Sequence, residues 1–148
     1  AAIDISELMP SDPYNDLGSV DFSAVLYPNI ENYDAPGKAI PLEKKIELAK
    51  NLESMTLKTD PRIKRVRRSA FDEAAFEIAI VDSNGEQIKH RQTLFSIDAT
   101  SVAEDGTEAE MGYDTQSSVD FENLKASEVA KNSANNAVRL LHSQDPSR

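Results

Sequence analysis

The chain of 148 residues has the size of a single domain, large enough to bury a core without disulfides or metals. It contains no cysteine, which excludes disulfides, thiolate nucleophiles and cysteine-based metal sites. The net charge of −10 opposes nucleic-acid binding, and no apolar run is long enough to cross a membrane. We therefore expect a soluble domain with neither a nucleic-acid nor a membrane partner.

Residues 1–41 are predicted to form an irregular, extended, proline-rich arm. They hold five of the seven prolines, and each proline removes a backbone donor and disfavours helix in the preceding residue. Within the arm, VDFSAVLY (Val20 to Tyr27) has the composition of one short strand, and the alternative is a surface connector. The first residues, AAIDISELMP, lack the features of a signal peptide and an initiating methionine, so we expect a chain that begins inside a longer protein.

The apolar spacing changes to that of a helix after Pro41, which suits a first helical position, whereas Ile40 offers no capping oxygen. Pro61 disfavours continuation beyond Asp60. The charged residues between these points lie around the rest of the helix. The apolar residues that recur at steps of four and three, and so predict the buried face, are Leu42, Ile46, Ala49, Leu52 and Met55.

Residues 63–117 show the alternating pattern of β-strands. Asn84-Gly85 and Asp105-Gly106 each separate two alternating runs, and both dipeptides suit a two-residue type I′ turn. Residues 75–115 are therefore predicted to form a three-strand antiparallel meander. The run RIKRVRRSAF is predicted to be a fourth strand, joined to the meander through DEAA.

A second helix is predicted from about Ser127 to His142. Its small apolar residues recur at helical spacing and permit close approach to a sheet. Together these elements predict an α+β fold in residues 42–148, an antiparallel meander of about four strands with two packed helices. The residues of the predicted stripe are Ala130, Ala134, Ala137 and Leu141.

No catalytic, cofactor or metal-binding residue is predicted. Zinc hydrolases commonly bind their metal through two histidines one helical turn apart, but the only histidines are His90 and His142, and neither HExxH nor HExxxH occurs. DSNGEQ lacks the alternating acidic ligands of a calcium loop. The sequence has no nucleophile elbow, phosphate-binding glycine loop or dinucleotide fingerprint.

The unusual charged feature is the basic run RIKRVRR. Strand alternation predicts Lys64 and Arg68 on one face and Arg65 and Arg67 on the other. A charged edge strand that resists unwanted pairing is one interpretation, and docking of an acidic partner is a second. Nucleic-acid binding is a third, but no aromatic platform accompanies the arginines. The candidate partner-contact residues, which share one face if their strands are neighbours, are Arg65, Arg67, Lys89 and Arg91.

Several segments, taken in order, resemble the TldD/PmbA family, once called modulators of DNA gyrase. They are DPYNDL, KIELAKNLESMTLKTDPRI, VDSNG, VAEDGTEAEMGYD and ASEVAKNSANNAVRLL. The S-x-G turn followed by AEDG and GYD looks more like the PmbA (TldE) branch than the TldD branch. The resemblance implies that residues 42–148 are an α+β segment of the N-terminal domain of a longer protein.

The resemblance also implies a partner and an activity. Family members pair as TldD with PmbA in a cytoplasmic zinc metallopeptidase assembly that acts on unfolded peptides, and the zinc-binding HExxxH motif belongs to the TldD subunit. The chain is therefore expected to be a non-catalytic scaffold or binding segment without its own cofactor. An autonomous acidic interaction module and a fragment of a zinc-bearing TldD-type subunit are the alternatives.

Overall fold

The computed structural model describes residues 2–10, 12, 14, 28, 30–82, 85 and 87–143. The chain divides into two compact units, residues 1–30 with 79–88 and residues 31–78 with 89–148. The elements in chain order are α1 (Ala2–Ser6), α2 (Ala35–Lys38), α3 (Leu42–Thr59), β1 (Ile63–Val81), β2 (Gln87–Asp105), β3 (Glu108–Ser118), the 3-10 helix η2 (Phe121–Asn123) and α4 (Ala126–Leu140).

The described part of residues 1–41 contains two short helices, α1 and α2, which the prediction of an extended arm did not include. In α2 the proline stands in the first turn, where its missing N–H costs nothing. The Asp34 carboxylate caps this helix by accepting a hydrogen bond from the Gly37 N–H (2.8 Å). The strand predicted for Val20 to Tyr27 lies outside the described residues.

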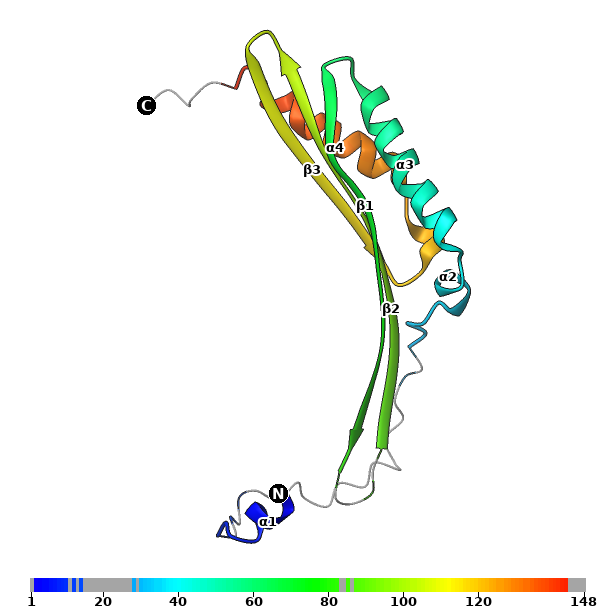
Figure 1. Ribbon diagram of the computed structural model, residues 1–148, viewed down its shortest axis with the longest axis vertical. Helices are drawn as coiled ribbons and strands as arrows, with labels where there is room; N and C mark the ends of the chain where they lie inside the picture. The colour runs from blue at the N-terminus through cyan, green and yellow to red at the C-terminus, as the bar shows by residue number, and fades with distance from the viewer. Residues whose placement is uncertain are drawn as a thin grey trace. The chain divides into compact units, whose positions relative to one another are not determined.

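The three strands form one antiparallel sheet in the order β1–β2–β3 (Figure 1). The pairing of β2 with β3 runs from Phe95 opposite Ser118 to Asp105 opposite Glu108. This confirms the α+β class with an antiparallel sheet. The predicted first two strands are one continuous strand, β1, in which Asp72 and Glu73 pair with Arg68 and Lys45.

Both hairpin turns differ from the predicted two-residue type I′ turns. Because Asp105 pairs with Glu108, the second loop is Gly106-Thr107, and only Gly106 has a positive φ (+61°), the pattern of a type II′ turn. In the other hairpin five residues lie between the end of β1 and the start of β2. There Gly85 has φ +87° and its N–H bonds the Asp82 carbonyl (3.2 Å).

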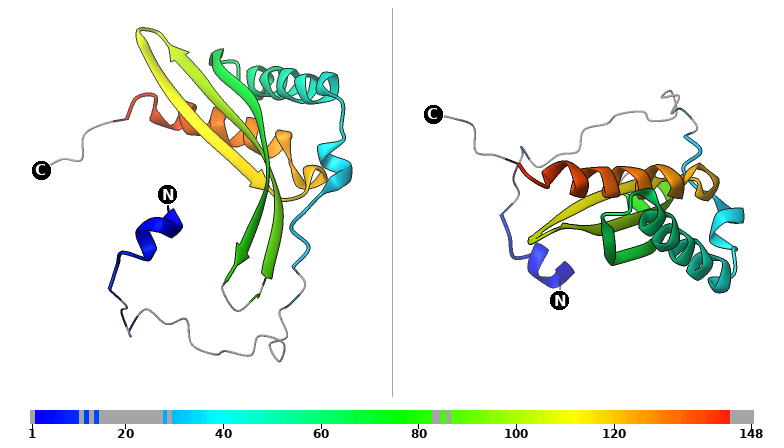
Figure 2. Two further views of the ribbon diagram at one scale, coloured as in Figure 1. Left: turned by 60° about the horizontal axis from the view of Figure 1, so that its bottom comes forward. Right: turned by 90° about the horizontal axis from the view of Figure 1, so that it is seen from above.

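Helices α3 and α4 pack on each other and cover the same face of the sheet (Figure 2). In β2 the odd-numbered residues point to this face, as the burial of Ile97, Ala99 and Ala103 shows. Three phenylalanine rings close one end of the core, with centroids 5.8–6.3 Å apart. They come from β1, β2 and η2, and are Phe71, Phe95 and Phe121.

The buried face of α4 agrees with the predicted alanine stripe, and that of α3 does not. In α3 the fully buried positions are Lys45, Leu52 and Thr56, whereas Ile46 and Met55 are 46% and 42% exposed. Polar residues take this face because each has an internal partner. The Thr56 hydroxyl donates to the Leu52 carbonyl (2.8 Å), and the Lys45 ammonium contacts Glu73 (2.6 Å).

Candidate functional site

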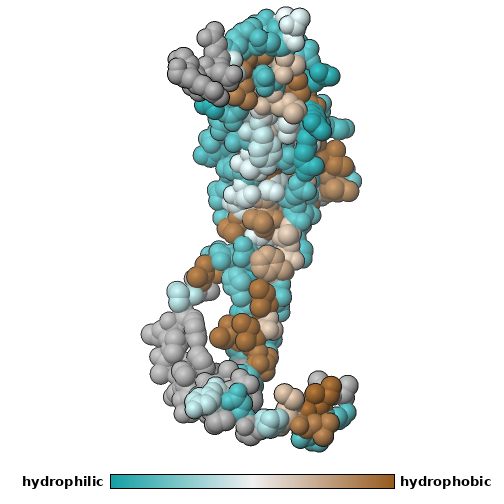
Figure 3. All heavy atoms as spheres, turned by 90° about the vertical axis from the view of Figure 1, so that its left-hand side faces the viewer, coloured by the Kyte–Doolittle hydropathy of each residue, from teal (hydrophilic) through white to brown (hydrophobic). Residues whose placement is uncertain are grey.

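The face of the sheet that α3 and α4 leave uncovered carries a groove across all three strands. Even-numbered residues of β2 point to this face, and the register places Val102 opposite Met111 of β3. Figure 3, which views one side of the molecule, shows apolar side chains in small patches among hydrophilic ones. The open-face groove has a volume of about 460 Å³ and is lined by Arg65, Val66, Arg67, Val102, Ala109 and Met111.

The arginines of the basic run differ in their partners. Arg65 pairs with Glu104 (2.6 Å), and Arg68 pairs with Asp98 (2.6 Å), whose hydrogen bond raises the pKa of the Arg68 guanidinium. The Arg67 guanidinium contacts only a thioether, the Met111 sulfur, at 3.6 Å. Among the described residues no carboxylate lies within ion-pair distance of Arg67.

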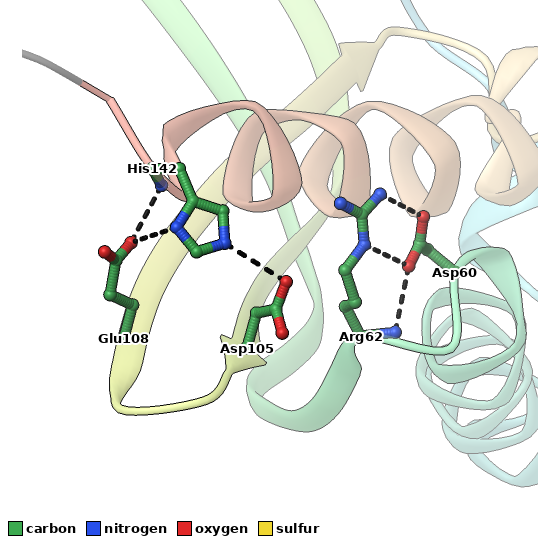
Figure 4. Close-up of polar contacts among 5 residues, drawn as sticks. All are labelled: Asp60, Arg62, Asp105, Glu108 and His142. Atoms are coloured by element: carbon green, nitrogen blue, oxygen red, sulfur yellow. Dashed lines mark hydrogen bonds and ion pairs between the residues drawn. The ribbon is translucent and has the colours of Figure 1, made fainter.

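At the start of β1, Arg62 closes a local ion pair with Asp60, whose carboxylate accepts from the guanidinium at 2.9 and 3.0 Å and from the backbone N–H of Arg62 at 2.9 Å (Figure 4). These hydrogen bonds lower the pKa of Asp60 to about 2. The pair holds the connection between α3 and β1.

The predicted division of the basic residues between the two faces is wrong. Arg65, Arg67 and Arg68 all contact side chains of the uncovered face, Glu104, Met111 and Asp98 respectively. Strict alternation would send Arg67 and Arg68 to opposite faces, whereas both guanidinium groups make their contacts on the uncovered face. Three guanidinium groups of the basic run therefore gather on this face.

The four candidate contact residues do not form one surface. Arg65 and Arg67 lie at the groove, whereas the Arg91 guanidinium lies over the ring of Tyr33, 4.7 Å from its centroid. Lys89 is exposed on the same strand as Arg91. Arg91 lies thirteen positions before Glu104, the partner of Arg65, along β2, which is about 40 Å of strand and several Debye lengths.

His142 joins the end of α4 to the β2–β3 hairpin (Figure 4). Its Nε2 lies 3.1 Å from the Asp105 carboxylate, its Nδ1 lies 3.3 Å from Glu108, and its backbone N–H donates to Glu108 (2.8 Å). The hydrogen bond with Asp105 and the charge of Glu108 raise the pKa of His142. This cluster fixes the helix end with φ +59° at His142, a position outside the ordinary helical range.

The side chains present do not fit a zinc centre. Both ring nitrogens of His142 face carboxylates with which they form internal contacts, and His90 lies fifteen residues before Asp105 along β2. Within the described ranges no three histidine, aspartate or glutamate side chains gather in a way that could hold a metal ion. We therefore assign no metal chemistry to these residues.

Sequence reasoning missed the apolar lining of the groove. A turn centred on Asp105-Gly106 would place Val102 opposite Ala109, two residues from its observed partner Met111. The signal for the observed register is Gly106, because glycine favours the first central position of a type II′ turn. A turn with Gly106 at that position gives the observed pairing.

The fold is that of an α+β domain whose antiparallel sheet has one face covered by helices and one face open. The family model described as the PmbA/TldA metallopeptidase central domain matches residues 35–141. The chain belongs to this family. The description as a central domain differs from the N-terminal placement that the resemblance implied.

Two solved structures share the fold. One is a proposed modulator of a DNA gyrase from Thermotoga maritima MSB8, with a TM-score of 0.75 and 19% identity over 83% of this chain. The other is a proposed modulator of DNA gyrase from Bacteroides thetaiotaomicron VPI-5482, with a TM-score of 0.77 and 23% identity over 97% of this chain. The chain spans 28% and 33% of the lengths of these two proteins.

A comparison with curated proteins gave no significant match. Among the described helices, none combines the length and the apolar character needed to cross a membrane.

Proposed function

We propose that this chain is a non-catalytic scaffold and binding segment of a PmbA-type subunit in a cytoplasmic TldD/PmbA zinc metallopeptidase assembly that acts on unfolded peptides. The observation that carries the proposal is the division of the sheet into a helix-covered face and a face that carries the open-face groove. Such a domain offers a binding surface while its helices supply the core. Membership of a family described as metallopeptidases supports the link to peptides.

In this proposal the zinc belongs to the TldD-type partner. Through its contacts with neighbouring carboxylates, His142 attaches the end of α4 to the β2–β3 hairpin. The chain then contributes to the assembly through surface and shape, and the reacting groups come from elsewhere.

The test uses the full-length parent protein, alone and together with its TldD-type partner. We expect the two to co-purify, zinc to accompany the partner, and cleavage of an unfolded peptide to require the partner. Stoichiometric zinc and cleavage by the parent protein alone, after chelation and reloading, would instead identify it as a zinc-bearing TldD-type subunit.

The separation of the candidate contact residues permits a matched comparison. One variant changes Arg65 and Arg67 to Ser at the groove, and the other changes Lys89 and Arg91 to Ser. If one pair contacts an acidic partner, its variant weakens pairing of the full-length subunits and reduces the dependence of pairing on salt. Unchanged affinity and salt dependence in both variants would assign all four residues to the protection of strand edges.

A further inference from the structure

We propose that the open-face groove binds an extended peptide segment in which one carboxylate side chain stands beside apolar side chains, and that Arg67 binds that carboxylate. The proposal rests on the proposed function, because it names the ligand of the binding face. It also specifies the position of each part: the apolar side chains lie along Val102 and Met111, and the carboxylate lies at the rim.

The first argument is the unused hydrogen-bonding capacity of Arg67. A guanidinium has five N–H donors in a planar fork that matches a carboxylate, and a thioether sulfur is only a weak acceptor. Arg62, Arg65 and Arg68 each contact a carboxylate within the chain, whereas among the described residues Arg67 contacts the Met111 sulfur alone. The Met111 contact orients the guanidinium at the groove without neutralising it.

The second argument is the apolar floor. Val66, Val102, Ala109 and Met111 supply aliphatic and thioether surface between the two arginines. A volume of about 460 Å³ lies within the range of sites that hold small ligands, roughly 300–1,000 Å³, and accommodates a few side chains. Met111 is half exposed and flexible, so it can adjust to different apolar side chains.

The third argument is charge, which limits the number of carboxylates in the ligand. The chain carries a net charge of −10, and this field opposes a strongly acidic segment at long range. At contact distance the Arg67 guanidinium dominates, because screening removes most interactions beyond about 10 Å. The groove therefore selects an apolar segment with one carboxylate over a polyacidic one.

The experiment measures fluorescence anisotropy of a labelled short peptide that has one glutamate between leucines, titrated with the 148-residue chain. A matched peptide carries glutamine in place of the glutamate. We expect the glutamate peptide to bind about tenfold or more tightly than the glutamine peptide, since a charge-assisted bidentate pair is the strong kind of hydrogen bond. Equal binding of the two peptides, or binding of neither, would overturn the proposal.

Arg67→Gln should remove the preference for glutamate, so that both peptides bind with the weaker affinity. Arg139→Gln is the control, because Arg139 lies on α4 and its guanidinium contacts, within the described part of the chain, the Asn136 side chain alone. It removes the same charge away from the groove and should keep the preference. A preference that survives Arg67→Gln, or that disappears equally in Arg139→Gln, would contradict the assignment to Arg67.

Val102→Thr tests the floor, because it keeps the side-chain shape and adds a hydroxyl to the apolar lining. It should weaken both peptides several-fold and leave the preference for glutamate intact. Circular dichroism and a urea titration of each variant identify any loss of folding, and backbone NMR shifts at Val66, Val102 and Ala109 locate the peptide on wild-type protein. Shifts confined to other residues would overturn the site. Pairing and zinc content of the full-length subunits are measured separately, so a failed groove leaves the proposed function standing.

Discussion

Gly112 of β3 lies directly against the backbone of Ala137 in α4. A Cβ atom on this glycine would come within 2.9 Å of the Ala137 Cα and closer still to the Ala137 nitrogen and the Ser133 carbonyl oxygen. On the neighbouring strand, the Ser101 hydroxyl donates to the same Ser133 carbonyl (2.9 Å). Helix α4 therefore packs on backbone and small side chains. Its distance from the sheet depends on Gly112, which has no Cβ atom.

Gly112→Ala should lower the free energy of unfolding by about 2–3 kcal/mol, because the added methyl meets backbone atoms that cannot rotate away. The urea midpoint measures the loss, and an unchanged slope shows that the same surface is still exposed on unfolding. The comparison is Gly106→Ala, where no atom lies within 4 Å of the added Cβ and the cost, about 1 kcal/mol, comes from the positive φ of +61°. A loss in Gly112→Ala no larger than in Gly106→Ala would mean that the close approach of α4 is not the cause.

The β2–β3 turn depends on the backbone conformation of Gly106 and not on space around it. Its φ of +61° is unfavourable for a β-branched residue, so Gly106→Val should cost about 1 kcal/mol or more. Gly106→Asn should cost less, because asparagine tolerates positive φ. Equal urea midpoints for wild type and the valine variant would show that this turn relaxes to another conformation.

The parts of the fold that were predictable are those set by local periodicity. The alanine stripe of α4 and the existence of α3 follow from spacing at three and four residues. The buried face of α3 did not follow, because Lys45 is buried only through Glu73, 28 residues away in the sequence. A pattern of apolar residues contains no information about such a partner.

The groove was less predictable than the fold for a related reason. Arg67, Val102 and Met111 come from three strands and meet only in the observed register. Arg67 was selected from the sequence because it belongs to a basic run. Unlike its neighbours, Arg67 has no carboxylate partner among the described residues, and this difference depends on which acidic side chains the register brings close to it.

Asp34 connects α2 to η2 and should be one of the most sensitive polar positions. Its carboxylate accepts hydrogen bonds from the Gly37 N–H (2.8 Å) and the Phe121 N–H (2.9 Å). Asp34→Ala leaves both donors unpaired and should cost about 2 kcal/mol by urea denaturation. Asp34→Asn keeps one acceptor and should cost less. Asp120→Ala removes a nearby exposed carboxylate and should change stability by no more than about 0.5 kcal/mol.

His142 should make stability depend on pH in a defined direction. Its pKa is raised above the ordinary 6.5, first by the hydrogen bond with Asp105 and then by the charge of Glu108. A raised pKa means that the contribution is fully present below pH 6.5 and is lost as the pH rises through the folded-state pKa. Wild-type protein should therefore lose more stability than His142→Asn between about pH 5 and about pH 9.

Asparagine is the suitable replacement because it tolerates the positive φ at this position, and the backbone N–H bond to Glu108 remains possible. NMR titration of the His142 ring provides an independent measurement. Asp105→Asn should lower the pKa of the ring relative to wild type. A ring that titrates at the same pH in both proteins would remove Asp105 as the cause.

The pair formed by Lys45 and Glu73 should respond very differently to loss of either partner. The Lys45 side chain is 7% exposed and its ammonium lies 2.6 Å from Glu73, whose own side chain is 42% exposed. Glu73→Ala leaves a buried ammonium with only the Lys38 carbonyl at 3.4 Å, and should cost about 1–3 kcal/mol, less than for a fully buried pair because water reaches this side.

Lys45→Met removes the charge and keeps the length and apolar stem, so it should leave the free energy of unfolding within about 1 kcal/mol of wild type. The double variant Lys45→Met with Glu73→Ala should then be more stable than Glu73→Ala alone, because no buried charge remains without its partner. Urea midpoints of the four proteins complete the cycle. A larger loss in Lys45→Met than in Glu73→Ala would show that the ion pair itself stabilises the packing of α3 on β1.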